Sequence, residues 1–472
     1  MDRRAFLGLA GAGLLAGALG CVTRGIASGR KPNIVLVLTD DFGYADLGCY
    51  GSPLNETPRI DALASEGVRF SDAYAACPVC SPTRASIMTG KYPARLHLTN
   101  FLKGVRSPED SPVLTAPYKD QLDLEEITVA EYLREAGYVT GHVGKWHLGA
   151  EPHFPEHQGF DETVGTKGAG GPGSYFWPGW KKNLDLEGRF EGEYLTDRLS
   201  EEASKFIERH ADRPFFLNVC HYAPHIKQEA KPDLVEKYRK KLESHPAAPG
   251  AQNNPVNAAM VESIDQGVGA ILDTLERLKL TDNTVFIFTS DNGGLSVLEG
   301  KNPPSTFNTP LREGKGHLYE GGIRVPLIVR WPGVTPRGAA CAAPVCSIDY
   351  LPTLCAAAGV TPKQSVDGID VSALFAKPER TLEREAIYWH YPHFANQGGR
   401  PGGAVRCGDW KLIESYETGK IELYNLKDDI GETRDLATSQ PETAKRLHKM
   451  LSDWRKEVDA TMPPPNPAWK GN

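Results

Sequence analysis

The sequence predicts an α/β fold with a large mixed, mostly parallel sheet flanked by helices, followed by a smaller C-terminal α+β subdomain that carries a short antiparallel sheet. Several short apolar runs are continuous rather than alternating, which is typical of strands buried on both faces of a parallel sheet. Helical segments lie between those runs, and shorter strands take over from about Thr361. A chain of 472 residues, 40% of them hydrophobic, is long enough for two such units.

We expect residues 1–29 to form an export signal and linker that stand outside the fold. Arg3 and Arg4 precede an apolar run from Ala5 to Leu19, and this layout resembles a twin-arginine export signal. Cys21 closes an imperfect lipoprotein cleavage box, so lipid attachment at Cys21 and a free exported protein are both open alternatives. The apolar run is shorter than the roughly 20 residues of a spanning helix. The sequence therefore predicts a periplasmic or extracellular protein with no transmembrane segment in its mature chain.

The larger domain is expected over residues 30–360. Its continuous apolar runs predict buried parallel strands at Ile34–Leu38, Tyr138–Val143, Phe215–Val219, Val285–Phe288 and Val325–Val329. Helices are predicted at Cys80–Gly90, Thr128–Ala136 and Asn257–Leu278. In the first of these helices, Pro82 suits the opening turn and Gly90 suits the end.

The C-terminal subdomain is expected over residues 361–472. Short strands are predicted at Ala386–Tyr391, Trp410–Glu414 and Glu422–Leu426, and a helix at Pro441–Val458. We expect this unit to close against the larger domain.

The charge distribution argues against a nucleic-acid partner. The 53 basic and 60 acidic side chains give a formal charge of -7, and no basic block is present. An anionic substrate must therefore be bound by a local cluster of cations. The nine cysteines are scattered, which leaves their pairing open.

Polar side chains follow the predicted strands at the points where those strands end. Because the carboxyl ends of parallel strands meet at one edge of a sheet, we expect these residues to lie together at that edge. We call this edge the mouth of the sheet. The residues are Asp40, Asp41, Lys145, His147, His225, Asp291 and Asn292.

Four of these residues, Asp40, Asp41, Asp291 and Asn292, supply hard oxygen ligands. Such ligands suit Ca²⁺ or Mg²⁺, whereas a zinc site would call for nitrogen or sulfur. The alternative is that the paired aspartates cap a helix and that Asp-Asn-Gly-Gly makes a turn.

Cys80 is predicted at the N-terminus of its helix, with Arg84 one turn later. Free N–H groups at that end and a planar guanidinium suit an anionic tetrahedral group such as sulfate or phosphate. Cys77 and Cys80 also form a Cys-x-x-Cys pair, which is found in redox and zinc sites, but no second pair at ligand spacing accompanies it.

The segment Cys80-x-Pro82-x-Arg84 with Thr89-Gly90 resembles the signature of the formylglycine-dependent sulfatases, arylsulfatase-like type I enzymes of the alkaline phosphatase superfamily. In order and spacing the resemblance covers nearly the whole mature chain. It continues through Asp40–Gly43, Gly144–Gly149, Pro224–His225, Ser290–Gly294, Gly314–Lys315 and Glu320–Pro326. It implies an alkaline phosphatase-like sheet and a catalytic domain within residues 30–360.

The resemblance also implies a sulfate-ester hydrolase in which a formylglycine-generating or anaerobic maturation enzyme oxidises Cys80. One hydroxyl of the hydrated aldehyde attacks sulfur, and the second later expels sulfate. A Ca²⁺ ion, with Mg²⁺ as the alternative, is bound by residue 80 and by Asp40, Asp41, Asp291 and Asn292.

Further roles follow from the same resemblance. Arg84 orients the hydrate, and Lys145, Lys315 and His225 bind sulfate and neutralise charge on the leaving oxygen. His225 is expected to protonate the leaving alcohol and His147 to assist the hydrate, because both roles need a group that titrates near neutrality.

A sulfated carbohydrate, either a polysaccharide or a glycosaminoglycan fragment, is the expected substrate. In the aromatic segment Tyr388–His393 and the following Gly398–Arg400, His393 and Arg400 are the candidate substrate contacts. The alternative is that this segment packs the two domains together.

Two other functions stay open from the sequence. A phosphoester hydrolase of the same superfamily shares the metal site but usually has a Ser or Thr nucleophile. An inactive protein that binds sulfated glycans would be marked by loss of the cysteine or of a metal ligand, and the sequence retains both.

Overall fold

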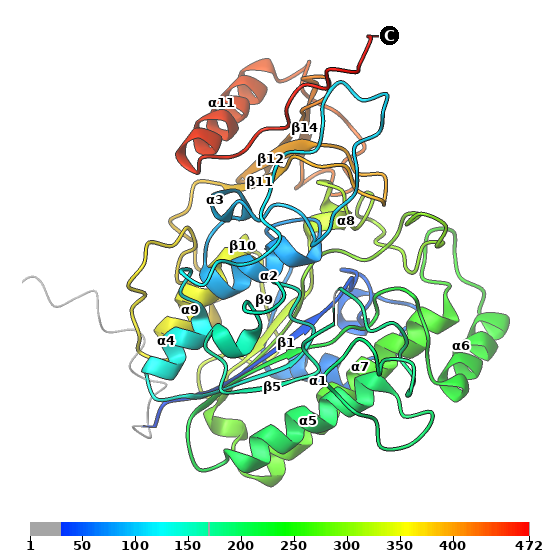
Figure 1. Ribbon diagram of the computed structural model, residues 1–472, viewed down its shortest axis with the longest axis vertical. Coiled ribbons are helices and arrows are strands. Elements are labelled where there is room, and N and C mark those ends of the chain that lie inside the picture. Colours follow the sequence, from blue (N-terminus) through cyan, green and yellow to red (C-terminus); the bar gives the residue numbers. More distant parts are fainter. Residues whose placement is uncertain (1–29, 169, 472) are drawn as a thin grey trace, which may run out of the picture.

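A central sheet runs through the larger part of the molecule and separates two layers of helices (Figure 1). The computed structural model describes residues 30–168 and 170–471, so the expected export signal and Cys21 lie outside the described residues. Among these residues the sheet has eight strands, β1 (Asn33–Thr39), β2 (Val68–Phe70), β4 (Val139–Gly144), β5 (Glu162–Val164), β6 (Phe215–Cys220), β7 (Thr284–Ser290), β8 (Leu327–Arg330) and β9 (Ala339–Cys341), in the order β5-β4-β6-β1-β7-β8-β2-β9.

The sheet is mostly parallel, with one strand reversed. Strands β5, β4, β6, β1 and β7 pair in parallel, whereas β8 is antiparallel to both β7 and β2. The prediction of a parallel strand at Val325–Val329 is therefore wrong in its direction. A parallel return from β7 would need a crossover to the opposite edge of the sheet. The segment 291–326 instead stays at the carboxyl edge, where it places Lys315, so β8 starts at the edge where β7 ends.

Alternation along β1 explains the two helical layers. Ile34, Leu36 and Leu38 belong to one core cluster, and Val35 and Val37 belong to the other. Because successive side chains of a strand point to opposite faces, a continuous apolar run packs against helices on both sides. One layer holds α2 (Cys80–Thr89), α4 (Val129–Glu135), α9 (Tyr350–Ala357) and α10 (Ser372–Ala376), and the other holds α1 (Pro58–Glu66), α5 (Leu195–Arg209) and α7 (Pro255–Arg277), with α6 (Pro232–Ser244) packed on α7.

Local sequence signals set the ends of two of these helices. Helix α2 begins at Cys80 and ends before Gly90, whose φ of 70° is the left-handed conformation that favours glycine. Helix α4 begins after Thr128, which forms a reciprocal capping box with Glu131. Both helices were predicted within one or two residues.

The C-terminal sheet lies at one end of the molecule, next to helix α11 (Figure 1). It is an antiparallel meander of β11 (Ile387–Tyr391), β12 (Gly402–Cys407), β13 (Trp410–Ser415) and β14 (Ile421–Asn425), covered by α11 (Pro441–Glu457). Strand β12 was not predicted, because its first two residues are glycines, which are depleted in strands.

A buried group of charges joins this sheet to the larger domain. Lys411 of β13 lies 2.9 Å from Glu320 and 2.8 Å from Glu432, and all three residues are fully buried. Arg324 and Arg406 converge nearby on Asp72. Glu320 opens the short helix α8 (Glu320–Ile323), so the subdomain fixes a segment that follows Lys315 in the chain.

The remaining described elements are α3 (Pro93–Leu96), the parallel pair β3 (Ala73–Tyr74) and β10 (Val345–Cys346), and four short 3-10 helices, η1 (Gly48–Tyr50), η2 (Pro155–His157), η3 (Thr281–Asn283) and η4 (Ser347–Asp349). Within residues 30–168 and 170–471 we find no helix with the length and apolar character needed to cross a membrane. The eight cysteines in the described part of the chain are all free thiols.

Candidate active site

The carboxyl ends of four neighbouring strands meet at one mouth of the sheet. Asp40 and Asp41 follow β1, Lys145 follows β4, and Asp291 follows β7. His225 lies a few residues beyond β6, and the segment between β7 and β8 brings Lys315 to the same place. The mouth predicted from the sequence therefore brings together the strand-end residues, with Cys80 and Arg84 supplied by helix α2.

Three buried carboxylates at the mouth each contact a buried cation. Asp40 Oδ2 lies 2.6 Å from Lys145 Nζ, and Asp41 Oδ2 lies 2.7 Å from Lys315 Nζ. Arg84 Nε donates to Asp291 Oδ2 at 2.8 Å. Charges of both signs are thus held in a site from which water is largely excluded, where electrostatic effects are strong.

The carboxylates differ in their pKa values. Burial raises the pKa of Asp291 to about 6 and also raises the pKa of Asp40. Burial acts in the same direction on Asp41, but Lys315 and His225 outweigh it and lower the pKa of Asp41 to about 2. The crowding of three acids disfavours their joint ionisation, which is the electrostatic situation that a bound cation relieves.

The residues at the mouth fit an oxygen-liganded divalent cation. Ligand atoms of Asp40, Asp291 and Cys80 lie within 4.8 Å of one another. Asp40 Oδ1 and Asn292 Oδ1 are buried oxygens without a hydrogen-bond partner in the described part of the chain. Asn292 is oriented by a 2.8 Å hydrogen bond that its Nδ2 donates to Asp41 Oδ1. Unsatisfied hard oxygens beside carboxylates are suited to Ca²⁺ or Mg²⁺.

Cys80 lies at the N-terminus of α2 and is only 3% exposed. Its Sγ is 3.3 Å from Nδ1 of His147. Burial raises the pKa of the Cys80 thiol, although Lys145 acts in the opposite direction. An unmodified Cys80 is therefore a poor thiolate nucleophile, which argues against a redox or cysteine-phosphatase role.

Both histidines at the mouth are held in the neutral form, so the expectation that they titrate near neutrality is wrong: burial among cations lowers the pKa of each. Burial and then Lys315 lower the pKa of His225 to about 4, and burial and then Lys145 lower the pKa of His147 well below its usual range. His225 Nδ1 lies 2.6 Å from the Ile226 carbonyl, which makes it the protonated nitrogen, so Nε2 accepts from Lys315 Nζ at 3.1 Å.

A cavity of about 220 Å³ opens onto these groups. Residues from both domains line it. They are Cys80, Phe101, Leu102, His147, Gly170, Gly171, His225, Glu299, Lys315 and Gln397. Glu299 and Gln397 were not among the predicted site residues, because neither belongs to a motif with a strand-end position.

The structure does not bring His393 and Arg400 to this cavity. His393 is fully buried, its Nε2 lies 2.7 Å from Thr99 Oγ1, and its ring packs against Tyr118. Arg400 is paired with Glu417 at 2.6 Å. The proposed substrate contacts of both residues stay predictions without support from their placement.

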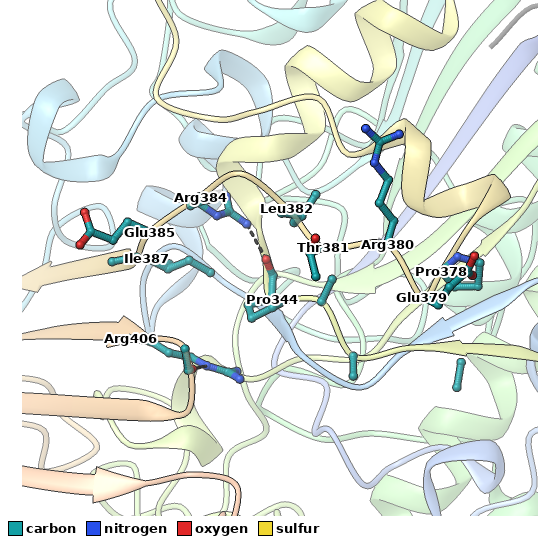
Figure 2. Close-up of a pocket in the computed structure, with 15 residues that line it drawn as sticks. Pro344, Pro378, Glu379, Arg380, Thr381, Leu382, Arg384, Glu385, Ile387 and Arg406 are labelled. Atoms are coloured by element: carbon teal, nitrogen blue, oxygen red, sulfur yellow. Dashed lines mark hydrogen bonds between the residues drawn. The ribbon is translucent and has the colours of Figure 1, made fainter. Parts of the chain in front are cut away.

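A second cavity, of about 500 Å³, lies where β9, residues 378–386 and the strands β11 and β12 meet (Figure 2). Figure 2 shows Arg384 donating to the Pro344 carbonyl, at 2.6 Å. Arg384 is also paired with Asp349, and Arg406 with Asp72. Because Arg384 and Arg406 are committed to protein partners, and because Cys80, His225 and Lys315 line the other cavity, this cavity is not a candidate for the chemistry.

Two models of known protein families together match nearly the whole described chain. The family model described as Sulfatase matches residues 32–360, and the model described as N-sulphoglucosamine sulphohydrolase, C-terminal, matches residues 314–457.

Individual relatives agree with the family models. Arylsulfatase A of Homo sapiens is 33% identical over 93% of this chain and 90% of its own length. N-acetylgalactosamine-6-sulfatase of Homo sapiens is 34% identical over 92% of this chain and 87% of its own length. The crystal structure of Ps i-CgsB in complex with k-i-k-neocarrahexaose superposes with a TM-score of 0.76 at 31% identity, covering 90% of this chain and 93% of that chain.

Proposed function

The chain belongs to the sulfatase family and is a sulfuric ester hydrolase, and from this premise we propose that it hydrolyses sulfate esters of a carbohydrate. The proposal includes the conversion of Cys80 to formylglycine and a Ca²⁺ ion, with Mg²⁺ as the alternative, at the mouth of the sheet.

One observation carries the proposal. The Cys80 thiol lies within 4.8 Å of ligand atoms of Asp40 and Asp291, at the rim of a cavity that Lys315 and His225 also line. Had residue 80 stood apart from the carboxylates, a nucleophile and a cation could not act on one sulfuryl group.

The protein groups have distinct roles in this proposal. Asp40, Asp41, Asp291 and Asn292 would hold the cation, which supplies positive charge to a sulfate oxygen. Residue 80, once converted and hydrated, supplies the hydroxyl that attacks sulfur.

The other side chains act on the substrate and on protons. Lys145 and Lys315 balance the charge that grows on the transferred group. Arg84 fixes Asp291 and, through a 2.7 Å bond to the Lys145 carbonyl, the segment after β4. His147 Nδ1 faces residue 80 and is placed to take its proton. His225 Nε2, which accepts from Lys315 Nζ, is placed to pass the proton of that ammonium on to the leaving alcohol.

Two relatives support a carbohydrate substrate. One is named for sulfate on N-acetylgalactosamine, and another was crystallised in complex with k-i-k-neocarrahexaose. A third relative, arylsulfatase A, is named for aryl sulfates, whose leaving group is a phenol.

Export and maturation complete the proposal. The arginine pair and apolar run at the N-terminus support an exported protein, periplasmic or extracellular, with lipid attachment at Cys21 as an alternative. A formylglycine-generating or anaerobic maturation enzyme would act on Cys80 before export.

The test combines mass and activity. After co-expression with a maturation enzyme, the peptide spanning residues 70 to 91 should be lighter by ~18 Da, as expected when CH₂SH becomes CHO. The matured protein should hydrolyse 4-nitrophenyl sulfate but not 4-nitrophenyl phosphate, and chelation should abolish the activity until Ca²⁺ is restored. A preference for the phosphate, or full activity in a Cys80→Ala variant, would contradict the proposal.

A further inference from the structure

Two polar side chains on the cavity wall have no part in the proposed sulfate chemistry. Glu299 belongs to the segment between β7 and β8, and Gln397 belongs to the segment between β11 and β12 of the C-terminal sheet. Their residues are 8% and 4% exposed. Segments far apart in sequence are thus folded together beside Cys80 to present a carboxylate and an amide.

Gln397 carries a buried oxygen that lacks a partner. Its Oε1 accepts no hydrogen bond from any residue that the structure describes. The side chain packs over Gly316, where an added Cβ would lie 2.9 Å from Oε1 and 3.1 Å from the Gln397 Cβ. Because a buried polar group is costly to leave unpaired, an orphaned acceptor on a residue that lines the cavity points to a donor on the ligand.

Glu299 is held in place by the subdomain. Its Oε1 accepts from Asn396 Nδ2 at 2.9 Å, and Gly300 N donates to the Asn396 carbonyl at 3.3 Å. Its Oε2 lies 3.3 Å from Lys315 Nζ, which is closer to Asp41 at 2.7 Å. Since Asp41 already neutralises Lys315, charge balance alone does not account for Glu299.

The charge of Glu299 shows which part of a substrate it faces. A carboxylate repels a sulfate group, so it suits the uncharged portion of the molecule that carries the ester. Carboxylate and amide oxygens accept hydrogen bonds from hydroxyl groups. Gly170 and Gly171 line the same cavity without side chains, which leaves space for a ring.

We propose that Glu299 and Gln397 form a saccharide subsite that accepts hydrogen bonds from hydroxyl groups of the sugar ring bearing the sulfate ester. This inference rests on the proposed function and narrows it, because the subsite selects sulfated sugars over aryl sulfates, which have no neighbouring hydroxyl to donate.

The test compares two substrate types across matched variants. Gln397→Ala and the isosteric Glu299→Gln are assayed on 4-nitrophenyl sulfate and on 4- and 6-sulfates of galactose and N-acetylgalactosamine. Leu298→Ala, at an exposed neighbouring position, is the control. Both subsite variants should lose about 10- to 100-fold in kcat/KM on the sugar sulfate that the unaltered enzyme hydrolyses best and change less than about threefold on the aryl sulfate. The control should change neither.

A binding measurement separates recognition from catalysis. In the Cys80→Ala background, calorimetric binding of the same sugar sulfate should weaken when Gln397→Ala is added. Equal losses on aryl and sugar sulfates would overturn the subsite, because the residues would then act on the common sulfate. Aryl sulfatase activity without hydrolysis or binding of any sugar sulfate would also overturn it while leaving sulfate-ester hydrolysis intact. Failure on every sulfate ester would instead contradict the proposed function.

Discussion

Arg84 binds two separate segments of the mouth through one side chain. Its Nε donates to Asp291 Oδ2 and its Nη1 to the Lys145 carbonyl, at 2.8 and 2.7 Å. The planar guanidinium makes both bonds at once, whereas a lysine would offer a single point charge.

Arg84→Lys should therefore lower kcat/KM on an aryl sulfate by about 100-fold or more, which steady-state kinetics would measure. The exposed Arg134 of α4 supplies the control variant Arg134→Lys, whose kcat/KM should be unchanged. Retained activity in Arg84→Lys would show that only the charge of Arg84 matters.

Asp265 lies outside the mouth and should make the free energy of unfolding depend on pH. It is 1% exposed and accepts from the backbone N–H of Ile60 at 2.8 Å, and burial raises its pKa to about 6. An acid whose pKa is higher in the folded state binds protons more tightly there, so its stabilising contribution is full at low pH and is lost as the pH rises through about 6.

Asp265→Asn keeps an oxygen acceptor and removes this titration. Relative to the unaltered protein, the free energy of unfolding of the variant should rise by on the order of 2 kcal/mol between pH 4 and pH 7. Urea unfolding across this range measures the difference, and a difference that is constant with pH would refute the assignment.

At the scale of elements, helix ends were the most predictable features. Pro82 and Gly90 bracket α2, and Thr128 with Glu131 starts α4, because caps act within one turn. The direction of β8 was not predictable, since it depends on where the preceding segment 291–326 runs.

Gly90 permits a test of one helix end. Its φ is 70°, and an added Cβ would lie 3.2 Å from Val366 Cγ1 and 3.3 Å from Leu351 Cβ. Gly90→Ala should lower the free energy of unfolding by about 2 kcal/mol, from backbone strain and crowding together. Gly408 has a φ of 59° with open space around its Cβ, so Gly408→Ala should show the strain alone, about 1 kcal/mol. Equal effects would mean that packing around Gly90 adjusts freely.

At the scale of the whole molecule, the sequence predicted the mouth better than the cavity wall. Asp40, Asp291 and Lys145 follow strand ends, so sheet topology alone places them together. Glu299 and Gln397 meet only because the C-terminal sheet docks on the larger domain, and no local pattern encodes that contact.

The docking of the two units can be tested at Lys411. Lys411→Met would remove the cation that Glu320 and Glu432 share; Glu320 would keep Arg324, but Glu432 would stay buried without a cation, which should lower the free energy of unfolding by about 3–5 kcal/mol in denaturant titrations. Lys420, which immediately precedes β14, pairs with Glu422 at the surface, and Lys420→Met should have little effect. A small effect at Lys411 would mean that the buried acids become neutral at little cost.

The depth of α2 has a consequence for the order of events in the cell. All ten of its residues are buried, so an enzyme could not reach the Cys80 side chain in the finished protein. If residue 80 is oxidised as proposed, the maturation enzyme must meet this stretch as an open chain, soon after synthesis. Adding that enzyme to purified folded protein should leave the thiol intact, while adding it to denatured chains before refolding should yield aldehyde, as peptide mass spectrometry would detect. Oxidation of the folded protein at a comparable rate would mean that α2 opens readily.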